Sequence, residues 1–306
     1  MQSFISFKLA AISNLQLPGT DGSSPSLSTP NVTPNLFGGM TLQGLFIDII
    51  VILAIVIGIP YAYAAILTVI NKSTKSKLAS WNVYSQIFIG GLGTFIHELS
   101  HAIMCLIFGH RIDDMKLLKL NLNDDQEQEG NKGSLGYVNH SYNPHSVWQL
   151  IGNLWIGLAP IFGCALAILG LTYVLSPDTF HSWLSFAQSP YLSFREIEHL
   201  ILIIIGYTKP LYLVVWFILV GMITIGGFDL SASDYKGTKV GIFVTAAVLI
   251  AITFLTASLG YYIPFRTALL KAFIPITIIL SLTTIISIMY WAVISLIFVI
   301  FSKGRS

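Results

Sequence analysis

Charged side chains are scarce in this chain. Only 10% of its 306 residues are Asp, Glu, Lys or Arg, whereas a soluble globular domain carries about 25%. Hydrophobic residues make up 54% of the chain, and its mean hydropathy is +0.76. This balance excludes an ordinary soluble enzyme. It predicts an all-α, polytopic integral membrane protein embedded in the lipid bilayer.

The chain also has few cysteines and no large excess of positive or negative charge. The two cysteines, Cys105 and Cys164, lie inside apolar segments, so we expect small buried hydrophobes and not a disulfide framework. The 16 basic and 14 acidic residues leave a formal net charge of +2. Proteins that bind nucleic acids concentrate positive charge on one face, so no nucleic-acid partner is expected.

Long apolar runs are what the chain has in abundance. Six of them are long enough to cross a bilayer. We predict transmembrane helices over about residues 43–70, 82–109, 147–176, 210–228, 240–259 and 272–301. No internal repeat relates these six segments to one another.

Two polar stretches interrupt this pattern. Residues 15–40 are rich in Pro, Ser, Thr, Gly and Asn, a composition that predicts a flexible tail over residues 1–42. Between the second and third helices, the segment GYVNHSY alternates polar and apolar residues, which predicts a short membrane-associated strand or hairpin. The chain is therefore divided into the tail, a first helix and loop (43–81), a transmembrane core (82–239) and a C-terminal helix pair (240–306).

The second apolar run contains three ionisable side chains, in the sequence His-Glu-Leu-Ser-His at residues 97–101. Positions i and i+4 share one face of a helix, so His97 and His101 can both direct a ring nitrogen at one metal ion. Glu98 lies beside them and can reach a water bound to that ion. This H-E-x-x-H arrangement is typical of zinc metalloproteases, in which the glutamate is the general base.

Chance is a poor explanation for this motif. With seven histidines and five glutamates in the chain, about 0.003 random occurrences are expected. Ionisable groups inside a membrane helix cost roughly 2.5–3.5 kcal/mol each and usually mark a function. The structural alternative is a pair of core histidines with an incidental glutamate. Three ionisable side chains within five residues make this alternative less favourable than a functional site.

A catalytic zinc needs a third protein ligand. Asp229 and Asp234 follow the fourth apolar run, where either carboxylate could reach the imidazoles from a second helix. The alternative is that one of them caps the next helix. The remaining candidates are histidines. His110 has an unsuitable spacing from the motif, and His140 and His145 are expected in a solvated loop.

These motifs resemble the site-2 protease superfamily of intramembrane zinc metalloproteases. The likeness covers about residues 82–239 and includes HELSHAI inside a span, GNLWIGLAPIFG at 152–163 and LSASDYKG at 230–237. The last stretch is similar to an S-x-x-D-x-K-G segment of compact bacterial members. The family's usual Asn-Pro-x-Pro…Asp-Gly signature is absent, and so is an insertion the size of a PDZ domain.

The resemblance implies a cofactor, a third ligand and a substrate. The cofactor would be Zn²⁺, held by His97, His101 and Asp234, with Asp229 as the alternative ligand. The substrate would be a membrane-embedded peptide or protein, cleaved in or near a transmembrane segment or at a signal-peptide remnant. The resemblance also implies a multi-pass protein of the bacterial cell membrane that acts in regulated intramembrane proteolysis.

Two further groups are candidates for substrate binding. Asn153 opens the third span and could donate to the substrate carbonyl and the oxyanion; the alternative is a hydrogen bond to a neighbouring helix. Tyr137, Val138 and Asn139 of the predicted strand could pair with an extended substrate, or belong to an ordinary surface hairpin. Glycines at 90, 91 and 93 are expected to allow close helix packing.

Two other functions remain possible from the sequence. A membrane transport or binding protein could use the same polar site for an ion or a small solute. A catalytically inactive relative could act as a chaperone or receptor. Composition and motifs predict no oligomeric state.

Overall fold

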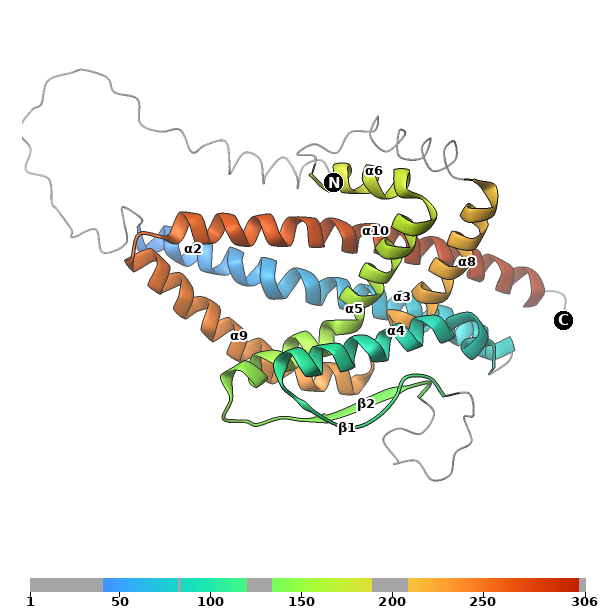
Figure 1. The fold of residues 1–306 in the computed structure, drawn as a ribbon, viewed down its shortest axis with the longest axis horizontal. Helices are drawn as coiled ribbons and strands as arrows, with labels where there is room; N and C mark the ends of the chain where they lie inside the picture. Colours follow the sequence, from blue (N-terminus) through green and yellow to red (C-terminus); the bar gives the residue numbers. More distant parts are fainter. Residues whose placement is uncertain (1–40, 82–83, 120–133, 189–208, 303–306) are drawn as a thin grey trace, which may run out of the picture. The chain divides into compact units, whose positions relative to one another are not determined.

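The computed structural model describes residues 41–81, 84–119, 134–188 and 209–302. The predicted tail, residues 1–42, lies outside them except for its last two residues. The elements are α2 (Leu42–Leu53), the π-helical segment η1 (Ala54–Gly58), α3 (Ile59–Trp81), α4 (Ser85–Phe108), β1 (Arg111–Lys116), β2 (Tyr137–Ser141), α5 (Val147–Leu175), α6 (Pro177–Gln188), α8 (Pro210–Gly227), α9 (Ala232–Ser258) and α10 (Tyr262–Ser302) (Figure 1).

The prediction of an all-α polytopic membrane protein is confirmed. Among the described residues, six helices are long and apolar enough to span a bilayer. They are Leu42–Ser80, Ile87–Phe108, Val147–Leu175, Pro210–Gly227, Ala232–Ser258 and Tyr262–Ile300. Large apolar side chains such as Phe46, Phe243 and Leu296 are exposed on these helices, as expected of surfaces that face lipid.

Two spans begin earlier than predicted. The fifth begins at Ala232 and the sixth at Tyr262, because polar residues extend each helix beyond its apolar run. Ser231 caps α9, with its side chain accepting from the Asp234 amide, and a capped polar turn is stable at a helix start. The boundary predicted at 239/240 therefore falls inside α9, and Asp234 lies in its first turn and not at the end of the fourth span.

The first span is continuous from α2 through η1 into α3. Pro60 stands in the first turn of α3 and has no N–H with which to pair the carbonyl of Val56. The helix widens into the π-helical turn of η1 directly before it, as helices do where the regular hydrogen-bond ladder is interrupted.

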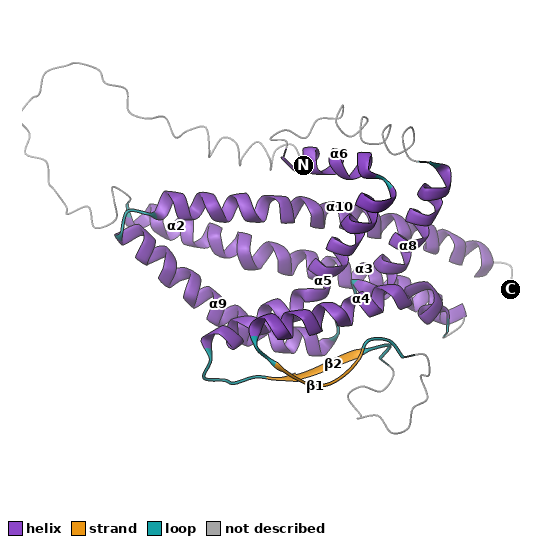
Figure 2. Ribbon diagram, in the orientation of Figure 1, coloured by secondary structure: helices purple, strands orange, loops and turns teal. Residues whose placement is uncertain are grey.

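The predicted hairpin is present between the second and third spans. Gly109 adopts a left-handed φ of 70° after α4 and turns the chain into β1, a helix end that favours glycine. β1 pairs antiparallel with β2 from Arg111↔Ser141 to Lys116↔Tyr137, with an irregularity between Ile112 and Asp114. Figure 2 shows these strands beside α4 in an otherwise helical structure.

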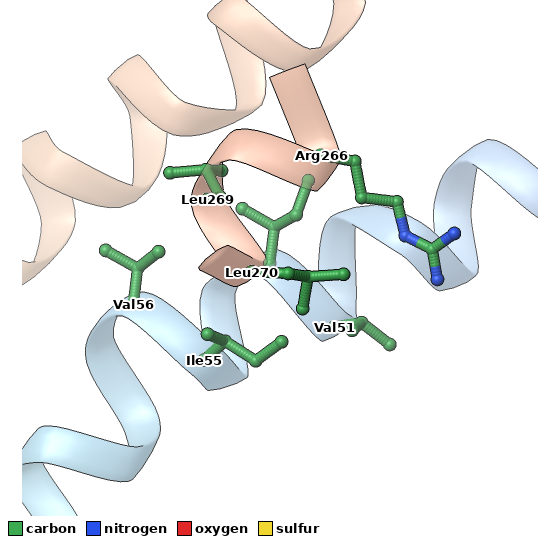
Figure 3. A pocket seen from close by; sticks show the side chains of 7 residues that line it. Val51, Ile55, Val56, Arg266, Leu269 and Leu270 are labelled. Atoms are coloured by element: carbon green, nitrogen blue, oxygen red, sulfur yellow. The ribbon is translucent and has the colours of Figure 1, made fainter. Parts of the chain in front are cut away.

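α2, η1 and α10 meet along an apolar surface. A pocket of about 10 Å³ lies between them (Figure 3), lined by Val51, Ile52, Ile55, Val56, Arg266, Leu269 and Leu270. A cavity needs about 10–15 Å³ to hold one water molecule, so this pocket is a packing gap and not a ligand site.

Glycines bring the helices of the site into backbone contact. A Cβ at Gly226 of α8 would lie 1.8 Å from the carbonyl oxygen of Gly90, and one at Gly93 would lie 2.6 Å from the amide nitrogen of Gly227. A Cβ at Gly157 of α5 would lie 2.7 Å from the carbonyl oxygen of Asp234. Small residues allow this approach in membranes, where lipid removes the hydrophobic drive for helix association. They therefore place α8 against α4, which carries the motif, and α9 against α5.

The α4–α8 contact gives a first prediction. Gly226→Ala should lower the unfolding temperature in detergent, because the added methyl group would overlap the Gly90 backbone and overpacking costs about 1–3 kcal/mol or more. Gly170→Ala is the matched control, since its Cβ would have no atom within 4 Å and should leave stability unchanged or raise it. Equal unfolding temperatures for the two variants would contradict this account of the contact.

Candidate metal centre

Three side chains from two separate helices converge inside the protein. α4 contributes His97 and His101, and α9 contributes Asp234. The two Nε2 atoms lie 3.2 Å apart. The carboxylate oxygens of Asp234 lie 3.3 Å from Nε2 of His101 and 3.9 Å from Nε2 of His97. One possible ligand atom from each residue thus lies within 4.8 Å of the others.

Backbone carbonyls orient both imidazoles. His97 Nδ1 lies 2.8 Å from the carbonyl oxygen of Gly227, and His101 Nδ1 lies 2.8 Å from that of Ile156. A carbonyl oxygen only accepts, so each Nδ1 carries the proton in the neutral ring and each Nε2 keeps its lone pair. Metal-binding histidines are typically oriented in this way by a partner on the other ring nitrogen.

The donor geometry suits a tetrahedral metal ion. Bonds of about 2.0–2.1 Å at tetrahedral angles separate ligand atoms by about 3.3–3.4 Å. Two of the observed separations are 3.2 and 3.3 Å, close to that value, and the third is longer, with His97 Nε2 at 3.9 Å from Asp234 Oδ2. Two imidazole lone pairs this close also repel unless a proton or a cation lies between them. The buried triad could therefore hold a metal ion, and two imidazoles with one carboxylate suit several divalent transition metals.

Asp234 both caps α9 and faces the imidazoles. Its Oδ2 accepts from the backbone N–H of Ser231 at 2.6 Å, while Ser231 Oγ accepts from the Asp234 N–H at 3.2 Å. Its other oxygen, Oδ1, is the one that lies 3.3 Å from His101. Ligand and cap were alternatives in the sequence analysis, but the geometry combines them. The capping box fixes the rotamer that directs Oδ1 at the triad.

Asp229 lies elsewhere in the same region. Its Oδ2 forms an ion pair with Lys75 of α3, at 3.2 Å. Asp229 does not belong to the group of ligand atoms that surrounds the imidazoles. Asp229, the alternative ligand, is thus paired with a lysine and not with the imidazoles. Nothing in the sequence indicated that a lysine of the first span would be its partner.

A cleft of about 390 Å³ opens over the triad. Glu98 lines it and is only 8% exposed. Its carboxylate takes no hydrogen bond from the described part of the chain, although the backbone of Gly136 lies against its side chain: a Cβ there would be 2.7 Å from Glu98 Cγ. The carboxylate is thus held beside the triad with no hydrogen-bond partner among the residues that the structure describes.

Asn153 also lines the cleft, from the second turn of α5. The residue is 3% exposed, and its Nδ2 has no hydrogen-bond partner among the described residues. A hydrogen bond from this amide to a neighbouring helix, the alternative in the sequence analysis, is therefore not formed. A buried amide donor without a partner costs free energy, so Asn153 is available for a group that enters the cleft.

The strand β2 forms one wall of the cleft. Tyr137, Val138 and Asn139 are half-buried and line it. The Tyr137 hydroxyl donates to Asp114 of β1 at 2.7 Å, and this hydrogen bond joins the two strands of the hairpin. In the described sheet β2 has one neighbour, β1, so its other edge carries backbone groups that can pair with an extended chain.

The expectation that His140 lies in a solvated loop is wrong. His140 belongs to β2, is half-buried and lines the cleft. Its Nδ1 lies 3.1 Å from Nδ1 of His110, whose Nε2 donates to the Gln149 carbonyl at 2.8 Å. Burial lowers the pKa of both rings, and the neighbouring histidines help to lower the pKa of His140 to about 4. His145 is exposed, as expected.

This neutral histidine pair was missed because its partners are distant in the sequence. His110 follows the C-terminal glycine of α4, and His140 stands opposite Ile112 in the hairpin register. Only the pairing of β1 with β2 brings the rings together. The pair therefore joins the end of the motif helix to the strand that lines the cleft.

Comparisons of the chain with protein-family models, with curated proteins and with solved structures found no match. The residues and their geometry establish a multi-pass membrane protein whose described residues form six helices able to span a bilayer, with a buried His97–His101–Asp234 triad that could hold a metal ion.

Proposed function

We propose that this protein is an intramembrane zinc metalloprotease of the site-2 protease type. It hydrolyses peptide bonds in or near a transmembrane segment or signal-peptide remnant, in the membrane of a bacterial cell. The observation that carries the proposal is the convergence of two imidazoles and a carboxylate from separate helices, with Glu98 in the wall of the same cleft. Three ionisable groups of this kind in one apolar helix pair are costly without such a role.

The ligand set suits zinc. Catalytic zinc is held by three nitrogen or oxygen ligands and keeps one position open, and His97, His101 and Asp234 supply that number. Zinc bound there would supply a Lewis acid that lowers the pKa of a water molecule toward 7. The open cleft of about 390 Å³ leaves room for water and for a peptide segment.

Glu98 is the proposed general base and acid. Its carboxylate takes a proton from water as the oxygen attacks the scissile carbonyl carbon, and then delivers that proton to the amide nitrogen as the C–N bond breaks. Protons and charge balance over the cycle, because the carboxylate returns to its starting state. The side chain is only 8% exposed, and no hydrogen bond from the described residues competes for the carboxylate, which leaves it free for this transfer.

The other cleft residues are proposed to bind the substrate. Asn153 Nδ2 donates to the carbonyl oxygen as negative charge develops on it, which stabilises the transition state. Tyr137, Val138 and Asn139 pair by their backbone with an extended substrate segment. A helical substrate hides its carbonyls in its own hydrogen bonds, so an edge strand beside the cleft meets a physical need of the reaction.

The experiment that tests the function uses the purified full chain in liposomes with a single-pass reporter peptide labelled at both ends. We expect cleavage that stops on treatment with a membrane-permeable chelator and returns on addition of Zn²⁺. Zinc flux across the liposomes without cleavage would favour a transport protein instead. Cleavage that persists after complete metal removal would contradict the metalloprotease.

A further inference from the structure

A proline interrupts the helix that packs against the motif. Pro160 lies inside α5, the helix that contacts both α4 and α9. Proline has no backbone N–H, so it cannot pair with the carbonyl four residues earlier, which is that of Ile156. Ile156 is 2% exposed, so water cannot easily satisfy this carbonyl. A buried carbonyl without a partner is unfavourable.

His101 supplies the missing donor. Its Nδ1 lies 2.8 Å from the carbonyl oxygen of Ile156, and its ring is 6% exposed. The bond requires the proton on Nδ1, because the carbonyl can only accept. The lone pair of Nε2 is then directed toward His97 and Asp234, at 3.2 and 3.3 Å.

We propose that Pro160 is a positioning residue for His101. Because Pro160 has no N–H to donate to the Ile156 carbonyl, that oxygen can accept from His101 and so fix the tautomer and orientation of the imidazole. The role of this positioning rests on the proposed metal centre, but the tautomer of His101 can be measured in the absence of metal.

The second imidazole supports this interpretation. His97 donates to the carbonyl of Gly227, the last residue of α8, and the last four carbonyls of a helix have no partner within it. Both rings thus use a helix carbonyl that its own helix leaves unpaired. At α8 the helix end frees the oxygen, and in the middle of α5 Pro160 does so.

The test is Pro160→Ala. The new amide at position 160 can donate to the Ile156 carbonyl and turn it back toward the helix axis, away from His101. Loss of partners that orient a metal-bound histidine typically weakens metal affinity by about 10–100-fold, and we expect a loss in that range. Helix stability should not fall, because proline is the least favourable residue in a helix interior.

Pro275→Ala is the matched control. Pro275 also lies inside a membrane-spanning helix, α10, but it does not line the cleft. Its replacement reports the general effect of removing a proline from a helix interior, and metal affinity should stay within about twofold of the wild-type value.

The measurement uses the full chain with ¹⁵N-labelled histidine in nanodiscs. The signal of His101 is assigned by comparison with His101→Gln. In metal-free wild-type protein we expect the Nδ1–H tautomer, and in Pro160→Ala a shift toward the Nε2–H tautomer. Zn²⁺ affinity of each variant is then determined by competition with a chelator.

Three outcomes are decisive. An Nε2–H tautomer in the wild-type protein would overturn the inference at once, whatever the variants do. An unchanged tautomer and affinity in Pro160→Ala would overturn it too, and Pro160→Gly provides the same new amide if the alanine variant does not fold. A tautomer shift specific to Pro160, in a protein that fails to bind zinc, would support the positioning role while rejecting the proposed function.

Discussion

Glu98→Gln is expected to abolish measurable cleavage while the protein keeps its fold and its metal. General acid–base groups contribute about 10²–10⁴-fold to catalysis, and an amide cannot take the proton from water. The substitution preserves the shape of a side chain that lies against the Gly136 backbone, so packing should be unchanged. The proposed ligands are the side chains of His97, His101 and Asp234, which the substitution leaves in place, so the zinc content should be that of the wild type.

The measurement combines reporter cleavage in liposomes with metal analysis of the same sample. Asp178→Asn is a matched carboxylate-to-amide control, because Asp178 is exposed in the first turn of α6 and lies outside the cleft. It should cleave at the wild-type rate. Near-normal cleavage by Glu98→Gln would eliminate Glu98 as the base, and another group of the cleft would have to take the proton from water.

Asp234→Asn is expected to lower the metal affinity by about 100-fold or more. Residues that merely orient ligands contribute about 10–100-fold, and Asp234 would lose the negative charge that directly faces the two imidazoles. The amide oxygen can still accept from the Ser231 N–H, so the cap of α9 should survive. Chelator competition measures the affinity, and the unfolding temperature shows whether the cap is intact.

Asp229→Asn tests which of the two candidate aspartates is the third ligand, because the residues alone left both possible. It breaks the ion pair with Lys75 but removes no member of the triad. Metal affinity should therefore change little in this variant. If Asp229→Asn released the metal and Asp234→Asn kept it, the assignment of the third ligand would be reversed.

The spans and the motif helix could be predicted because they are local features. Six apolar runs of sufficient length predict six helices, and i, i+4 spacing places His97 and His101 on one face. The alternation in GYVNHSY likewise predicts β2. Its partner β1, RIDDMK, was not predicted. Most of its side chains are exposed, so the sequence shows no alternation of polar and apolar residues there, and the strand pairs through its backbone groups.

Features that depend on contacts between distant segments were beyond prediction. The early start of α9 depends on a capping box whose carboxylate also faces the imidazoles. The choice between Asp229 and Asp234 depended on the family resemblance, since nothing local indicates that Lys75 pairs with the first. Carbonyls that orient imidazoles carry no side-chain signal, although Pro160 indirectly marks one of them.

The central claim is tested most directly by the metal content of the purified, folded protein, measured by mass spectrometry for the wild type and for His101→Ala. The account predicts about one zinc per wild-type chain, as for a single catalytic site, and almost none in the variant. A folded wild-type protein without stoichiometric metal, or a variant that retains it in full, would contradict the claim that these helices hold a catalytic ion.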